Sequence, residues 1–134
     1  RLGKKSGTGF RKYVGKKGTP SADPDFLPIL EQHRISSRTI SDEEVEDRLL
    51  LAMLLEGVRT LEERIVREPM HVDLGLILGI GFPAFRGGLL KWCDNQGAAR
   101  LLERIRKYEH LGARFAPTAQ FIEMARSGAK FYPA

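Results

Sequence analysis

The chain has 134 residues, of which 42% are hydrophobic and 29% are charged, and its formal net charge at pH 7 is +5. That length suffices for one domain with its own hydrophobic core, and no run approaches the roughly 18 consecutive apolar residues of a membrane span. The single cysteine, Cys93, excludes an internal disulfide and a cysteine-based zinc site, and we expect it to be a buried hydrophobic residue beside Trp92.

The positive charge is concentrated near the first residue. Residues 1–20 hold seven of the 22 basic residues and none of the 17 acidic ones. We expect residues 1–19 to form a basic, glycine-rich tail and residues 20–40, which contain three prolines, to form a linker over a surface. Such a tail either contacts phosphate groups, on nucleic acid or coenzyme A, or is simply a solvated linker. Phe10 and Tyr13 are its only aromatic residues and no binding motif accompanies them, which argues against nucleic acid.

A long helix is predicted over residues 41–68. Ser41 and Glu44 have the spacing of a capping box, and Pro69 prevents simple continuation of the helix. Apolar residues fall on two neighbouring stripes, which predicts burial around most of the circumference. One stripe holds Val45, Leu49, Ala52 and Met53, and the other holds Leu50, Leu54, Val58, Leu61 and Ile65.

A shorter helix over residues 70–78 and a glycine-rich turn over residues 79–88 are expected next. Residues 79–84 match the dinucleotide-binding pattern G-x-G-x-x-(G/A). That fingerprint needs a strand before it and a helix directly after it. Here Pro83 lacks a backbone N–H, and the preceding segment has Pro69 and Asp73 placed as in a first helical turn. We therefore predict a helix followed by a tight packed turn, with no cofactor bound.

Three further helices complete the prediction, at residues 88–93, 98–111 and 118–126. The second of these is clearly amphipathic, with Gly112 as its expected C′ residue, and Gly128 closes the third. No segment shows convincing strand alternation. The sequence therefore predicts an all-α fold, a compact bundle of about five helices over residues 41–134.

No catalytic constellation is evident in the sequence. His33, His71 and His110 are scattered, and none has a carboxylate or cysteine partner at metal-ligand spacing, so we expect surface or capping roles. The acidic residues between Asp42 and Asp47 are accounted for by the dipole of the helix that they begin. The chain also starts with Arg1 rather than methionine and without a signal-like segment, so we expect an inactive piece of a longer enzyme.

The stretch from Val72 to Pro83 fits (I/V)-D-x-(A/G)-x-x-x-G-x-G-x-P, and in this it resembles the C-terminal domain of the 3-hydroxyacyl-CoA dehydrogenases. Residues 41–134 resemble the second of two consecutive domains of this kind in multifunctional fatty acid oxidation proteins, of the bacterial complex α-subunit and trifunctional-protein α type. The matching stretches are Asp47-Arg48-Leu49-Leu50, Leu61-Glu62-Glu63, Gly79 to Gly88, Arg106-Lys107-Tyr108-Glu109, Phe115-Ala116-Pro117 and Lys130-Phe131-Tyr132-Pro133.

The resemblance implies a parent enzyme that oxidises L-3-hydroxyacyl-CoA with NAD, the cofactor and a His–Glu pair belonging to a preceding Rossmann domain. The first helical copy of the family completes the acyl-CoA site with an Asn before Arg-Leu-Leu, where this chain has Asp47. This departure implies a structural role, with no cofactor and no metal held by this fragment. A thiolase β subunit is an implied partner, and an enoyl-CoA hydratase half is a further possibility. The implied compartment is the cytoplasm in bacteria, and the mitochondrial or peroxisomal matrix in eukaryotes.

The partner implied for this domain is the preceding copy in the same chain. We expect the glycine turn to form the interface, with Phe82 and Phe85 displayed on it, and the isolated fragment to self-associate. The expected interface residues are Gly79, Gly81, Phe82, Pro83, Phe85, Gly87 and Gly88. The other hypothesis is an independent helical interaction module whose basic tail binds nucleic acid or an acidic partner.

The head of the chain resembles the segment that ends the first copy. Residues 5–10 and 126–131 also share the pattern basic-Ser-Gly-x-x-Phe. This is the trace that a domain duplication would leave.

Overall fold

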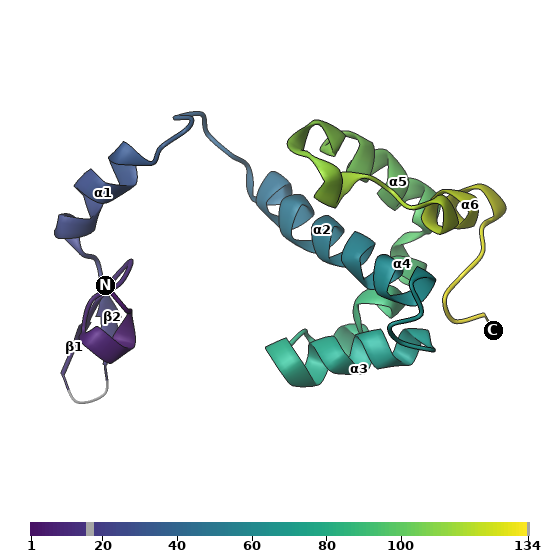
Figure 1. Ribbon diagram of the computed structural model, residues 1–134, viewed down its shortest axis with the longest axis horizontal. Coiled ribbons are helices and arrows are strands. Elements are labelled where there is room, and N and C mark those ends of the chain that lie inside the picture. Colours follow the sequence, from purple (N-terminus) through teal and green to yellow (C-terminus); the bar gives the residue numbers. More distant parts are fainter. Residues whose placement is uncertain (16–17, 134) are drawn as a thin grey trace. The chain divides into compact units, whose positions relative to one another are not determined.

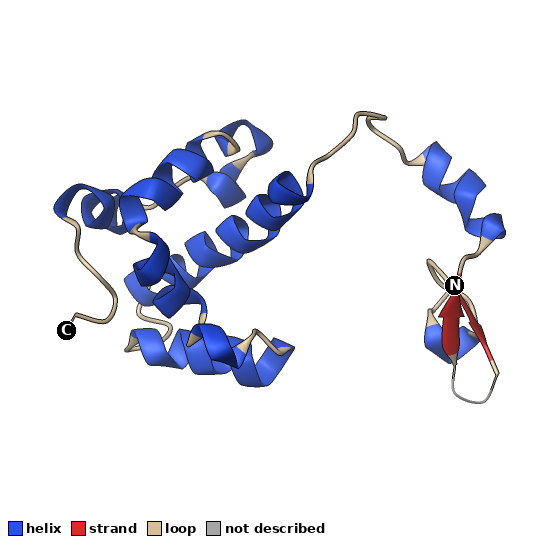
Figure 2. Cartoon of the chain, turned by 180° about the vertical axis from the view of Figure 1, so that it is seen from behind, coloured by secondary structure: helices blue, strands red, loops and turns tan. Residues whose placement is uncertain are grey.

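The computed structural model describes residues 1–15 and 18–133 and separates into two compact units, Arg1–Thr39 and Ile40–Ala134. We call them the N-terminal unit and the helical unit. Six α-helices and one small two-stranded sheet are present among the described residues, of which 61% are helical (Figures 1 and 2). The predicted all-α class is therefore confirmed.

The N-terminal unit is built on a short hairpin that the sequence analysis did not predict. Strands β1 (Lys12–Val14) and β2 (Thr19–Ser21) pair antiparallel with Tyr13 opposite Pro20. Each strand has three residues, too few to show a period-two pattern, so the expectation of no strand was wrong. The remaining elements are the 3-10 turns η1 (Lys4–Ser6) and η2 (Pro24–Phe26) and helix α1 (Leu27–Gln32).

Asp23 anchors this small unit. The Asp23 side chain is buried and forms ion pairs with Arg1 and with Lys12, whose Nζ lies 3.5 Å from Oδ1. A buried carboxylate costs free energy unless cations and N–H groups surround it, so these contacts draw the first residue and the hairpin together. Gly9 permits a close backbone approach, because a Cβ there would lie 2.7 Å from the Cα of Gly3.

Helix α2 (Asp42–Glu62) begins as predicted but ends six residues early. The Ser41 hydroxyl accepts a hydrogen bond from the Glu44 N–H at 3.2 Å, which is the predicted cap. At the other end Arg64 adopts a left-handed conformation with φ 56°, and the Ile65 N–H donates to the Thr60 carbonyl at 2.9 Å. The left-handed residue of such a Schellman turn is usually glycine. An arginine at that position gives no sequence signal that the helix ends there.

The buried face of α2 lies between the two predicted stripes. Leu54 and Val58 of the second stripe are fully buried, but so are Leu51 and Leu55, which belong to neither stripe. Val45, Leu49 and Ile65 are exposed, contrary to the prediction of burial around most of the circumference. The core-facing set Leu51, Leu54, Leu55 and Val58 follows the 3–4 spacing of a helix covered mainly along one side.

The other helices of the helical unit pack around α2. They are α3 (Pro69–Ile80), α4 (Leu89–Gln96), α5 (Ala98–Arg106) and α6 (Ala119–Ser127), with 3-10 turns η3 (Ala84–Arg86), η4 (Glu109–Leu111) and η5 (Ala113–Phe115). Helix α3 lies along one side of α2, and α5 and α6 lie on the other (Figures 1 and 2). The predicted helix 98–111 is interrupted after Arg106, because Lys107 and Tyr108 donate to carbonyls three residues back.

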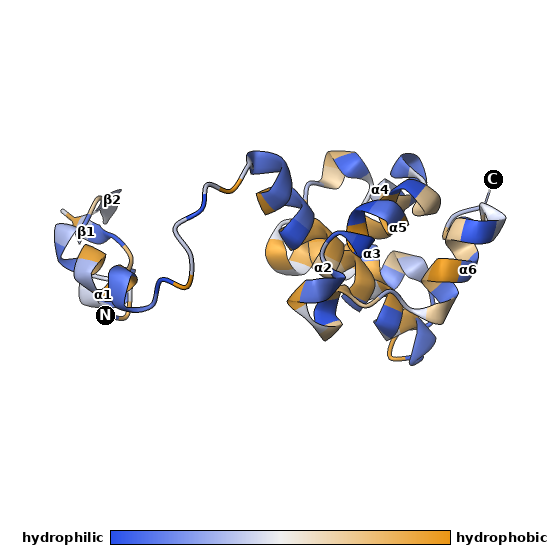
Figure 3. Cartoon of the chain, turned by 90° about the horizontal axis from the view of Figure 1, so that it is seen from above, coloured by the Kyte–Doolittle hydropathy of each residue, from blue (hydrophilic) through white to orange (hydrophobic). Residues whose placement is uncertain are grey.

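The hydrophobic core joins α2, α4, α5 and α6. Its fully buried members include Leu89 and Leu90 on α4, Leu101 on α5 and Phe121 on α6. Hydrophobic residues gather in the interior of the helical unit, and hydrophilic residues cover most of its outer side, with α3 as the exception (Figure 3). Thr118 caps α6, and Gly128 ends it in a left-handed conformation as expected.

Candidate functional site

One position was implied by the family resemblance to have lost a substrate-binding role. The carboxylate at that position is buried and bonded to other residues of the domain. Asp47, on α2, is 1% exposed and forms an ion pair with Arg104 of α5. Its other oxygen accepts a hydrogen bond from the Tyr108 hydroxyl at 3.1 Å. Burial raises the pKa of Tyr108, and the bond to Asp47 raises it further. Both carboxylate oxygens are therefore used within the domain to join α2 to the segment around α5.

A second buried carboxylate, Asp73 on α3, caps the start of α4. It is 3% exposed and accepts hydrogen bonds from the backbone N–H groups of Leu90 at 2.7 Å and Lys91 at 3.1 Å. Gly88 makes this contact possible, because a Cβ at that position would lie 2.2 Å from the Asp73 Cγ. Asp73 of the motif and Gly88, which lies five residues after the motif ends, thus form one helix cap together.

The C-terminal strap, residues 129–133, is held by a third carboxylate. Asp94 on α4 accepts the backbone N–H groups of Phe131 and Tyr132, both at 2.9 Å. The Tyr132 hydroxyl then donates to Asp73 at 2.8 Å, and the Lys91 ammonium lies 5.6 Å from the centre of the Tyr132 ring. Burial raises the pKa of Tyr132, with the bond to Asp73 as the next cause. Neither the role of Asp94 nor the strap was predicted from the sequence, where Lys130-Phe131-Tyr132-Pro133 was only a stretch matching the family.

The glycine turn departs in part from its predicted arrangement. Gly81 ends α3 in the left-handed conformation, with φ 74°, and the Phe82 N–H donates back to the Leu76 carbonyl. This reversal carries the Phe82 ring into the core, where it is 7% exposed, so its expected display was wrong. Phe85 is 86% exposed, as expected. Gly79, Pro83 and Gly87 also lie on the surface, whereas Gly88 is buried.

Helix α3 presents apolar side chains outward. Met70 and Leu74 are about half exposed, and Leu78 is 82% exposed, at successive i, i+4 positions. The only fully buried residue of this apolar helix is Asp73. With the neighbouring turn, these side chains form a surface that we call the α3 outer face: Met70, Leu74, Leu78, Ile80 and Phe85.

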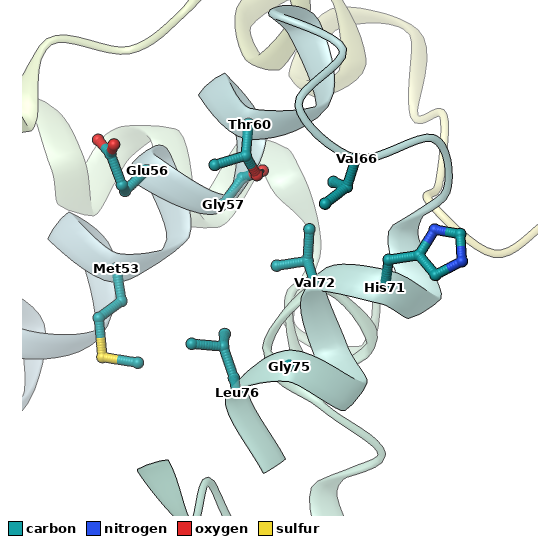
Figure 4. A pocket seen from close by; sticks show the side chains of 9 residues that line it. All are labelled: Met53, Glu56, Gly57, Thr60, Val66, His71, Val72, Gly75 and Leu76. Carbon is teal, nitrogen blue, oxygen red and sulfur yellow. Dashed lines mark hydrogen bonds between the residues drawn. The ribbon is translucent and has the colours of Figure 1, made fainter. Parts of the chain in front are cut away.

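An open apolar groove of about 320 Å³ lies between α2 and α3. Met53, Val72 and Leu76 face one another across it, and the backbone of Gly57 and Gly75 lines its walls (Figure 4). His71 lies at the edge, with its ring turned away (Figure 4). The polar residue Glu56, also at the edge, forms an ion pair with Arg59 at 3.1 Å.

The other residues considered from the sequence do not meet at a site. His33 ends α1 in the N-terminal unit, and His71 and His110 are exposed on separate parts of the helical unit. Within residues 1–15 and 18–133 no three side chains of the metal-binding types come together. Cys93 is 1% exposed beside the buried Trp92, as expected, and burial raises the pKa of its thiol to about 12. A thiol so rarely ionised is not a nucleophile.

Comparison with known proteins gives these contacts a family context. No family model matches the chain. It is 42% identical over 135 residues to the fatty acid oxidation complex subunit alpha of Pseudomonas paraeruginosa, covering 98% of this chain and 19% of that protein. The chain is homologous to a part of fatty acid oxidation complex α subunits. The corresponding subunits of Pseudomonas syringae pv. syringae and Ectopseudomonas oleovorans are 42% and 39% identical over the same shares.

The chain spans about a fifth of the length of these α subunits, and the matching part is their C-terminal one. The predicted resemblance to fatty acid oxidation complex α subunits is therefore confirmed. None of the described helices combines the length and the apolar character needed to cross a bilayer.

Proposed function

We propose that the helical unit is a noncatalytic domain of a multifunctional fatty acid oxidation enzyme that has NAD-dependent L-3-hydroxyacyl-CoA dehydrogenase activity. One observation carries the proposal: the Asp47 carboxylate, at the position of the family's substrate-binding Asn, is occupied by Arg104 and Tyr108. A group that is buried and paired within its own domain is not free to bind a substrate. NAD and the acid–base pair then belong to other domains of the parent chain.

The partner proposed for this domain is the preceding helical copy in the same chain. The α3 outer face supports this, because apolar side chains along a helix and its turn favour a protein contact over water. Phe85 and Leu78 are the most exposed members of that face. A thiolase β subunit stays a proposed partner of the parent complex. The bacterial origin of the relatives favours the cytoplasm among the compartments considered.

We further propose that the head of the N-terminal unit ends that preceding copy. The glycine of the repeated pattern has a similar φ angle in both copies: Gly7 follows η1 with φ 75°, and Gly128 follows α6 with φ 73°. The two phenylalanines of the pattern differ in environment. Phe131 packs against the core of the helical unit, whereas Phe10 is 80% exposed. A preceding helical domain would give Phe10 the cover that Phe131 already has.

The alternative of a nucleic-acid-binding tail loses support from the ion pairs of the N-terminal unit. Arg1 and Lys12 are paired with Asp23, and Lys12 also contacts Asp25 at 3.1 Å. These two cations are therefore partly neutralised within the unit.

The proposal is tested by Asp47→Ala in the full-length protein. Asparagine is the family's own residue at this position, so alanine is the change that removes any contact with a substrate. We expect dehydrogenase kcat/KM per folded protein to stay within about threefold of the unchanged enzyme. The matched control is Asp42→Ala, an exposed residue on the same helix. A hundredfold loss of kcat/KM in Asp47→Ala alone, with unchanged circular dichroism, would show that this copy takes part in substrate binding.

A further inference from the structure

Helix α3 contacts α4 more extensively than it contacts α2. Its partly buried residues Val72, Leu76 and Ile77 reach the core, but an open apolar groove of about 320 Å³ lies between α3 and α2. Side chains that line such a groove lack packing partners on that side. The one buried residue of α3 is the carboxylate Asp73, which binds α4 and the strap rather than α2.

We propose that the C-terminal strap is a latch that holds α3 on α4 and thereby fixes the α3 outer face. The latch has two connected parts. Asp94 holds the strap by the backbone N–H groups of Phe131 and Tyr132, and the Tyr132 hydroxyl carries the connection on to Asp73. The strap thus links a carboxylate of α4 to a carboxylate of α3.

The buried Asp73 carboxylate depends on the latch for one of its hydrogen-bond donors. A buried carboxylate is stable when several donors surround it, and Asp73 has three, two from α4 and one from Tyr132. Without the Tyr132 hydroxyl, the Asp73 oxygen that it contacts has fewer hydrogen-bond donors around it in a buried site. The response that costs the least free energy is an outward movement of α3 that lets water reach Asp73. This movement is a local opening rather than global unfolding. This inference does not depend on what covers the α3 outer face.

Hydrogen exchange of the 134-residue chain, read by mass spectrometry, tests the latch with two variants. Tyr132→Phe removes the hydroxyl donor, and Asp94→Asn turns an amide N–H₂ toward one of the two strap N–H groups. We expect amides of α3 to exchange about tenfold faster in each variant, the factor for one charge-assisted hydrogen bond, while α5 and α6 keep their rates.

The control is Tyr13→Phe, which removes a hydroxyl from the N-terminal unit and leaves the latch intact. Unchanged α3 exchange in both latch variants would overturn the proposal. Equal acceleration of every helix in the helical unit would also overturn it, because the strap would then be an ordinary contributor to global stability.

Discussion

At the scale of single residues, the helical unit devotes its buried carboxylates to holding helices together. Asp47 joins α2 to α5, and Asp73 joins α3 to α4 and the strap. Both residues belong to sequence motifs that suggest a functional site. Their donors are backbone N–H groups, an arginine and tyrosine hydroxyls, which leaves neither carboxylate free for proton transfer.

The Asp47–Arg104 pair gives a residue-scale prediction about stability. Asp47→Ala leaves the largely buried Arg104 guanidinium, whose Nε already has no partner among the described residues, without its counter-charge. We expect the free energy of unfolding to fall by about 3 kcal/mol, measured by urea denaturation. The double variant Asp47→Leu/Arg104→Leu removes both charges and should recover most of that loss. A double variant that is no more stable than Asp47→Ala would contradict the assignment.

At the scale of elements, helix starts could be predicted and several helix ends could not. Ser41, Thr118 and Pro69 begin helices through interactions within one turn, so the sequence alone reveals them. The end of α2 depends on Arg64 in a conformation that arginine seldom adopts. The roles of Asp73 and Asp94 could not be predicted either, because their strap partners lie 59 and about 38 residues away along the chain.

The end of α2 gives an element-scale prediction. Arg64→Gly removes the steric penalty of a Cβ at φ 56°, and glycine is the usual residue at this position of a Schellman turn. We expect the free energy of unfolding to rise by about 0.5 kcal/mol, since glycine also gains entropy in the unfolded chain. Glu63→Gly is the matched control, because Glu63 has ordinary helical geometry with φ −76° and should lose stability. The expectation fails if Arg64→Gly is the less stable of the two.

At the scale of the whole molecule, the two units differ in how much of their structure could be predicted from the sequence. The five helices of the helical unit follow from apolar periodicity, but the hairpin of the N-terminal unit depends on Asp23 meeting Arg1 across 22 residues. Of the α3 outer face, only Phe85, in the neighbouring turn, was anticipated from the sequence. Periodicity cannot separate a helix with two apolar sides from one that is buried all round, and α3 is apolar on nearly every side.

The α3 outer face gives a prediction for the molecule in solution. Uncovered apolar side chains favour association, so we expect the weight-average mass from light scattering to rise with concentration. Leu78→Asp and Phe85→Asp should each shift the chain toward monomer, because a charge there must be desolvated on association. Ile35→Asp, at a fully exposed site in the N-terminal unit, serves as the control. Association that persists unchanged in both α3 variants would place the contact elsewhere.

The contact between Asp73 and Gly88 has a consequence for how the helical unit folds. Helix α4 has eight residues, too few to be stable alone in water, and two of its first N–H groups find their acceptor only on α3. Its first turn therefore gains its cap at the moment α3 arrives, while α3 gains its buried anchor from the same contact. We therefore expect the two helices to enter the native state together, in one cooperative step.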